Sequence, residues 1–81
     1  ERLAARRRDA LALQAARGPQ AALPLFDALV AEAPAHAGLR ADRGVCRVLA
    51  GLKKEGEADL REALRLDPGH EDAARSLQAL R

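Results

Sequence analysis

Few side chains in this sequence could carry out chemistry. It contains one cysteine, Cys46, one serine, Ser76, and two histidines, His36 and His70, but no threonine or tyrosine. A nucleophilic cysteine or serine needs a neighbouring base, and no such motif accompanies either residue. A lone cysteine also cannot form an internal disulfide. We therefore expect no catalytic residues, and we predict that Cys46 is buried as a small apolar side chain.

The two histidines stand in similar segments, EAPAHAG and LDPGHED. His36 and His70 lie 34 residues apart, and so do Pro34 and Pro68. Two ligands of one zinc ion must both lie about 2 Å from it, whereas neighbouring units of a helical array stand about 10 Å apart. The sequence thus predicts no metal site and no cofactor. The histidines are interpreted as turn residues between repeated units.

Three consecutive arginines, Arg6 to Arg8, form the only cluster of like charge. Successive helical residues turn by about 100°, so these side chains point in three directions and cannot share one flat surface. A solvated charged face is the first interpretation, and binding to an acidic partner is the alternative. With 14 basic and 12 acidic residues and a single aromatic, Phe26, nucleic-acid binding is not expected.

The composition favours a single small helical domain. Its 81 residues are 48% apolar, mostly alanine and leucine, which form helices better than sheets. No apolar run reaches the roughly 18 residues that cross a bilayer, and no signal peptide is visible, so a cytoplasmic location without membrane insertion is the default. The alanine- and arginine-rich composition suggests a bacterial source, and an opening Glu1 suggests a segment of a longer protein.

Helical periodicity then divides the chain. Apolar residues at three- and four-residue steps, with glycine and proline between them, predict helices over residues 2–16, 20–33, 37–50, 54–66 and 70–80. Pro24 removes a backbone donor, so we expect an irregular first turn or a start near Ala21 in the second helix. Gly44 weakens the third helix by about 1 kcal/mol relative to alanine, which indicates a packing reason for it.

Helices one and two repeat as helices three and four with a period of 34 residues. A fixed period of this size predicts a stacked array, because each helix pair needs its neighbour to cover its apolar face. The fifth helix would cover the second pair.

Residues 37–70 resemble the 34-residue helix pair of the tetratricopeptide repeat family. Gly44, Gly51 and Gly56 stand where the family has small residues, Leu60 where it has a bulky one, and Leu66-Asp67-Pro68 matches its usual ending. Residues 3–36 resemble a degenerate first repeat, and residues 71–81 a capping helix or the start of a third repeat. Positions that the resemblance implies for structural packing are Ala10, Ala22, Phe26, Gly44, Gly56, Leu60, Ala63 and Pro68.

The resemblance implies an all-α, right-handed superhelical array of two antiparallel helix pairs with a concave surface that binds peptides or partner helices. Chaperone-binding members of the family hold a carboxylate with basic residues and asparagine, but of the corresponding positions here only Arg7 suits, and Asp72 would repel a carboxylate. We therefore reject that mode. The surface would be apolar at its centre and charged at its ends. The partner-binding residues of the groove would be Arg7, Leu11, Gln14, Ala41, Asp42, Val45, Val48, Asp72 and Arg75, and its lining would also include Arg8, Ala15, Leu49 and Ser76.

These patterns predict a non-catalytic protein-interaction module that binds a peptide or a partner helix. Two alternatives stay open. Exposed apolar ends could make the chain a self-assembling unit, or the chain could be a regulatory appendage of a larger enzyme. The groove residues could also pack against another domain.

Overall fold

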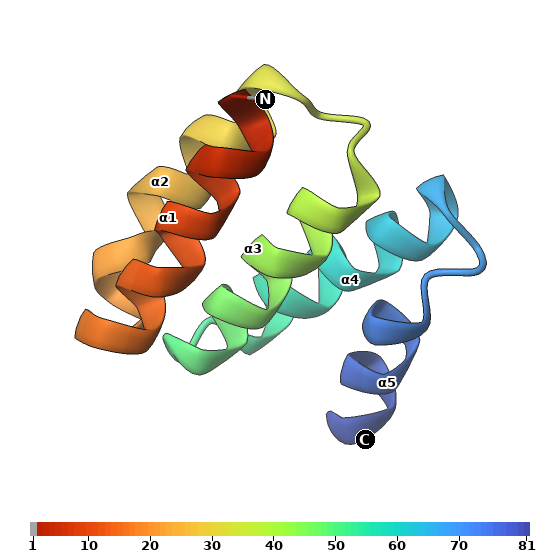
Figure 1. The fold of residues 1–81 in the computed structure, drawn as a ribbon. Coiled ribbons are helices and arrows are strands. Elements are labelled where there is room, and N and C mark those ends of the chain that lie inside the picture. Colours follow the sequence, from red (N-terminus) through yellow and green to blue (C-terminus); the bar gives the residue numbers. More distant parts are fainter. Residues whose placement is uncertain (1) are drawn as a thin grey trace.

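In a computed structural model, residues 2–81 form helices joined by short turns (Figure 1). Glu1 lies outside the described residues. The helices are α1 (Arg2–Arg17), α2 (Pro19–Glu32), α3 (Ala37–Leu49), α4 (Lys53–Leu66) and α5 (Glu71–Ala79). The described residues contain no strand, so the expectation of an all-α fold is confirmed. Neighbouring helices in the chain run in opposite directions, and the two ends of the chain lie far apart (Figure 1).

Glycine and proline end the helices close to the predicted boundaries. Gly18 and Gly51 have φ values of 94° and 90°, which residues with a Cβ rarely adopt. The prediction for Pro24 is wrong, because α2 begins at Pro19 and continues through Pro24. Pro19 suits a first helical position, where its missing N–H has no helix partner to lose. Pro24 is exposed, so water can reach the carbonyl that it leaves unpaired.

Both histidines cap helices. The Nδ1 atom of His36 accepts a hydrogen bond from the backbone N–H of Leu39 at 3.1 Å, and Nδ1 of His70 accepts one from Ala73 at 3.1 Å. In each case the donor lies three residues further on, inside the first turn of α3 or α5. The repeated histidines therefore do more than occupy a turn. Each satisfies a backbone donor that the helix itself cannot pair.

Removing either cap is expected to reduce stability. His36→Ala and His70→Ala should each lower the free energy of unfolding by about 1 kcal/mol, since a first-turn N–H loses its acceptor. Urea denaturation followed by circular dichroism measures the change. His36→Asn and His70→Asn are the controls, because asparagine caps helices well and should retain most of the stability. Equal losses in the alanine and asparagine variants would mean that the ring matters for packing and not for capping.

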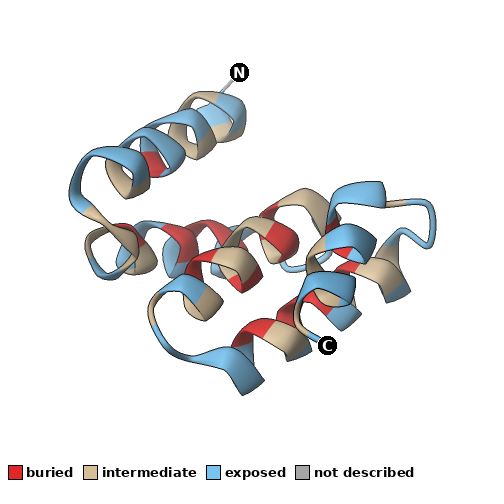
Figure 2. Ribbon diagram, turned by 90° about the horizontal axis from the view of Figure 1, so that it is seen from below, coloured by how far each residue is buried: buried red, intermediate tan, exposed pale blue. Residues whose placement is uncertain are grey.

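The buried residues form two clusters on opposite sides of α3. The first is centred on Phe26 and joins α1, α2 and α3, with Leu29, Leu39 and Cys46 nearly inaccessible to solvent. The second joins α3, α4 and α5 around Leu60. Figure 2 shows that buried positions concentrate on the middle helices. In α1 and α5 only one residue each is buried, so these two helices have a neighbour on one side and are open on the other.

Gly44 of α3 and Gly56 of α4 allow these two helices to lie in close contact. A Cβ on Gly56 would lie 2.4 Å from Val48 Cγ2 and 2.6 Å from the carbonyl oxygen of Gly44. A Cβ on Gly44 would lie 2.9 Å from the carbonyl oxygen of Gly56 and 3.0 Å from Leu60. Real Cβ atoms do not tolerate such distances, so α3 and α4 can approach this closely only with glycine at both positions.

Seven of the eight positions expected to pack are buried. They are Ala10, Ala22, Phe26, Gly44, Gly56, Leu60 and Ala63. Pro68 is the exception, because it is exposed in the turn between α4 and α5 and packs in neither cluster. A proline after a helix prevents the helix from continuing, and that local effect does not require burial.

A buried ionic cluster also joins α2, α3 and α4. Asp59, only 3% exposed, accepts two hydrogen bonds from Arg43 at 2.9 Å and one from Arg47 at 3.0 Å. These hydrogen bonds raise the pKa of the Arg43 guanidinium, against the effect of burial. We call the whole set the Asp59 cluster. It comprises Asp27, Arg40, Arg43, Arg47 and Asp59.

Sequence reasoning missed this cluster. A signal was present, because Arg40, Arg43 and Arg47 follow one another at three- and four-residue steps and so share one face of a helix. Their partner could not be read in the same way, since Asp59 belongs to another helix. The cluster lies away from the predicted groove, and its arginines are already paired with carboxylates, so we interpret it as structural.

Candidate functional site

Residues of α1, α3 and α5 converge on one hollow of about 180 Å³, which we call the central hollow. Seven of the nine predicted groove residues line it, although they are spread from position 7 to position 72 of the sequence. The lining residues are Arg7, Leu11, Gln14, Ala41, Asp42, Val45, His70, Asp72 and Ser76. Among these, His70 is the one that sequence analysis did not place in the groove. Its position at the start of α5, a helix predicted to line the groove, was the available signal.

The remaining two predicted residues lie elsewhere. Val48 lines a neighbouring hollow. Arg75 is 67% exposed and lines neither of these two hollows, because its guanidinium pairs with Asp72 and Glu71 on its own helix. A residue three or four positions along a helix from two carboxylates is drawn along the helix surface toward them.

The carboxylates of the central hollow are both paired. Arg7 Nε lies 2.5 Å from Asp42 Oδ2, so an ion pair links α1 to α3 across the groove. Asp72 forms its pair with Arg75. One polar atom is not satisfied, because Gln14 Oε1 is buried and has no hydrogen-bond partner among residues 2–81.

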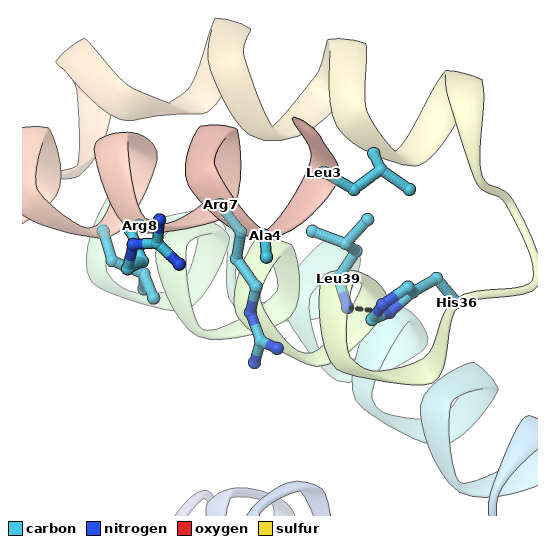
Figure 3. Close-up of a pocket in the computed structure, with 7 residues that line it drawn as sticks. Leu3, Ala4, Arg7, Arg8, His36 and Leu39 are labelled. Carbon is cyan, nitrogen blue, oxygen red and sulfur yellow. Dashed lines mark hydrogen bonds between the residues drawn. The ribbon is translucent and has the colours of Figure 1, made fainter. Parts of the chain in front are cut away.

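A second hollow of about 350 Å³ lies beside the N-terminal half of α1, and we call it the basic hollow (Figure 3). Figure 3 shows the side chain of Arg7 extending away from α1, with the ring of His36 joined to the backbone of Leu39. Its lining contains no carboxylate from residues 2–81. The lining residues are Leu3, Ala4, Arg7, Arg8, Leu11, His36 and Leu39.

The three consecutive arginines have three different environments. Arg6 donates two hydrogen bonds to Glu32 of α2, at 2.7 and 2.6 Å, and these lower the pKa of that carboxyl. Arg7 pairs with Asp42. Arg8 is exposed and forms no ion pair or hydrogen bond with any described residue. The side chains of Arg6 and Arg7 are 38% and 39% exposed, so they stay partly solvated while each pairs with a carboxylate of another helix.

A third hollow of about 170 Å³ lies beside the C-terminal ends of α3 and α5, and we call it the apolar hollow. Its lining contains no charged side chain and includes Leu49, which is 59% exposed. The lining residues are Val45, Val48, Leu49, Leu60, Ser76, Ala79 and Leu80.

The three hollows are neighbours that share lining residues, and we call them together the groove. Arg7 and Leu11 line both the basic and the central hollow, while Val45 and Ser76 line both the central and the apolar hollow. The groove is thus basic at one end, mixed with paired charges in the middle, and apolar at the other end. The expectation of an apolar centre with charged ends is wrong. Leu11 and Val45 stand beside charged residues, and Val48 and Leu49 gather at the C-terminal end of α3.

Cys46 is buried, as predicted, and lies outside the groove. Its Sγ donates a hydrogen bond to the carbonyl oxygen of Pro19 at 3.2 Å, and burial raises the pKa of the thiol. A buried thiol with a raised pKa is a poor nucleophile. Among residues 2–81, no three histidine, cysteine or acidic side chains are grouped as metal ligands. None of the helices described is both long and apolar enough to span a bilayer.

Comparison with protein-family models, with curated proteins and with solved structures finds no match to this chain. The groove and its chemistry are therefore interpreted from the residues themselves.

Proposed function

We propose that this chain is a non-catalytic interaction module, with two tetratricopeptide-like helix pairs and a capping helix, whose groove binds a peptide or a partner helix. The observation that carries the proposal is the convergence of side chains from α1, α3 and α5 on the central hollow, which shares lining residues with the basic and apolar hollows. These three helices alternate with α2 and α4 in the chain. A groove lined by every second helix is what an array of helix pairs would present to a partner.

The chemistry of the groove suits a segment more than a small molecule. Leu11 is 40% exposed and Leu49 is 59% exposed, so each end of the groove offers apolar surface that a partner can cover. An amphipathic helix lays its apolar face on such a surface.

A matched pair of leucines tests the groove. Leu11 in the groove and Leu25 on α2 are 40% and 38% exposed, so aspartate at either position should disturb folding equally little. We expect Leu11→Asp to weaken peptide binding about tenfold or more, because a carboxylate must be desolvated when the groove is covered, while Leu25→Asp binds normally. The probe is a display library of random helical peptides selected on the immobilised protein. Affinities of selected peptides are then measured by fluorescence polarisation.

A second groove variant guards against an indirect effect. Val45→Asp, in the wall shared by the central and apolar hollows, should also abolish binding while circular dichroism shows an unchanged helix content. Equal binding by the wild type, Leu11→Asp and Val45→Asp would show that the selected peptides bind elsewhere and would exclude this groove as the site.

A further inference from the structure

The groove carries one uncompensated charge, and it lies at one end. Arg8 lines the basic hollow, is exposed, and has no ionic partner among residues 2–81. Arg7, which precedes it in the chain, forms an ion pair with Asp42. Among residues 2–81 no carboxylate lines the basic hollow, so an anionic group placed there meets attraction from Arg8 without repulsion from these lining residues.

The rest of the groove adds no second free charge. In the central hollow the two carboxylates, Asp42 and Asp72, are each engaged by an arginine. The apolar hollow is lined only by uncharged side chains, and a charged group seated there would lose water without gaining a partner. The electrostatic profile of the groove is therefore asymmetric along its length. A partner with a charged end and an apolar end can therefore match the groove in only one of its two possible orientations.

Resting on the function proposed above, we propose that the occupant is an amphipathic helix with acidic residues at one end and large aliphatic residues at the other. Its acidic end lies in the basic hollow against Arg8, and its aliphatic end lies in the apolar hollow against Val48 and Leu49. Complementary charge at one end gives the complex its register, and apolar burial at the other gives it most of its affinity.

The size of the protein limits the length of the occupant. The longest dimension of the helix array is 28 Å. A helix rises about 1.5 Å per residue, so an occupant that does not extend beyond the array has at most about 18 residues, or five turns. Acidic and aliphatic residues of the partner should thus gather at opposite ends of the helix and not mix within one turn.

The selected peptides from the display library test this inference. We expect an excess of aspartate and glutamate in the residues at one end and of leucine, isoleucine and valine at the other. Arg8→Glu should weaken their binding about tenfold, since it turns an attraction into a repulsion. Arg61→Glu, the same change at an exposed position of α4 outside the groove, is the control and should bind as the wild type does.

The direction of binding is tested separately. A photo-crosslinking residue at the acidic end of a selected peptide should attach to α1, and one at the aliphatic end should attach to α3 or α5. Attachment in the opposite sense would overturn the proposed direction.

The outcomes separate this inference from the proposed function. If the selected peptides need Leu11 and Val45 but show no acidic excess, or if Arg8→Glu and Arg61→Glu bind equally well, the groove functions but the charged occupant is wrong. If the peptides ignore Leu11 and Val45, or if none is selected, both proposals fall. A second copy of this chain as occupant would give concentration-dependent dimers in sedimentation that Val45→Asp abolishes, and this result would also overturn the acidic partner.

Discussion

Asp59→Asn is expected to lower the free energy of unfolding by about 3 kcal/mol. The carboxylate accepts hydrogen bonds from Arg43 and Arg47, whose side chains are only 14% and 24% exposed. Asparagine keeps the size of the side chain but removes its charge, so two half-buried guanidinium groups would lose their main counter-charge. The loss is large because such a group cannot recover its full hydration without moving out of the contact between α3 and α4.

Asp27→Asn is the matched control for this prediction. Asp27 pairs with the same arginines at 3.4 and 3.9 Å, but its side chain is 54% exposed. Exposed pairs contribute about 0–1 kcal/mol, so this variant should be nearly as stable as the wild type. Urea denaturation of both variants at neutral pH measures the difference. If the two variants lose the same stability, burial of Asp59 is not what makes the cluster important.

Gly56→Ala should lower the free energy of unfolding by about 1–3 kcal/mol, although alanine is the better helix former by about 1 kcal/mol. The added Cβ would meet Val48 Cγ2 at 2.4 Å and the carbonyl oxygen of Gly44 at 2.6 Å. The valine side chain could rotate, but the Gly44 oxygen belongs to the backbone of α3 and can move only if the helices separate. Gly44→Leu should cause a similar or larger loss for the same reason.

Gly69→Ala provides the control for the glycine contact. A Cβ at Gly69 would meet only Asp67 Oδ1, at an ordinary distance of 3.6 Å. This variant should unfold at nearly the wild-type urea concentration. Loss of stability in Gly69→Ala but not in Gly56→Ala would contradict the close approach of α3 and α4.

The helices themselves were predictable because their causes are local. Apolar residues at helical spacing, glycines at 18 and 51, and prolines at 19, 34 and 68 place the ends of the elements to within a residue or two. Pro24 shows the limit of such reasoning. A proline removes one hydrogen bond, and whether the helix tolerates that loss depends on the water and the side chains around it, which the local sequence does not specify.

The groove was predictable in its members but not in its character. Seven of nine residues converge on the central hollow, because helix periodicity places them on one face of each helix. The predicted distribution of charge along the groove, with an apolar centre and charged ends, was wrong. Whether Arg7, Arg8 or Arg75 is free or paired depends on carboxylates that are close in space, and in the case of Arg7 the partner lies 35 residues away.

The amino-acid sequence by itself determined an all-helical chain, the positions of its turns and the burial of Cys46. Each of these follows from the conformational preference of a residue or from a periodic pattern within one or two helices. The tertiary structure decided that Asp59 gathers arginines from α3, that the histidines cap helices, and that Arg8, alone of its run, has no ionic partner among residues 2–81. Ion pairs between helices depend on distances of a few ångströms between elements, and those distances exist only once the helices have packed.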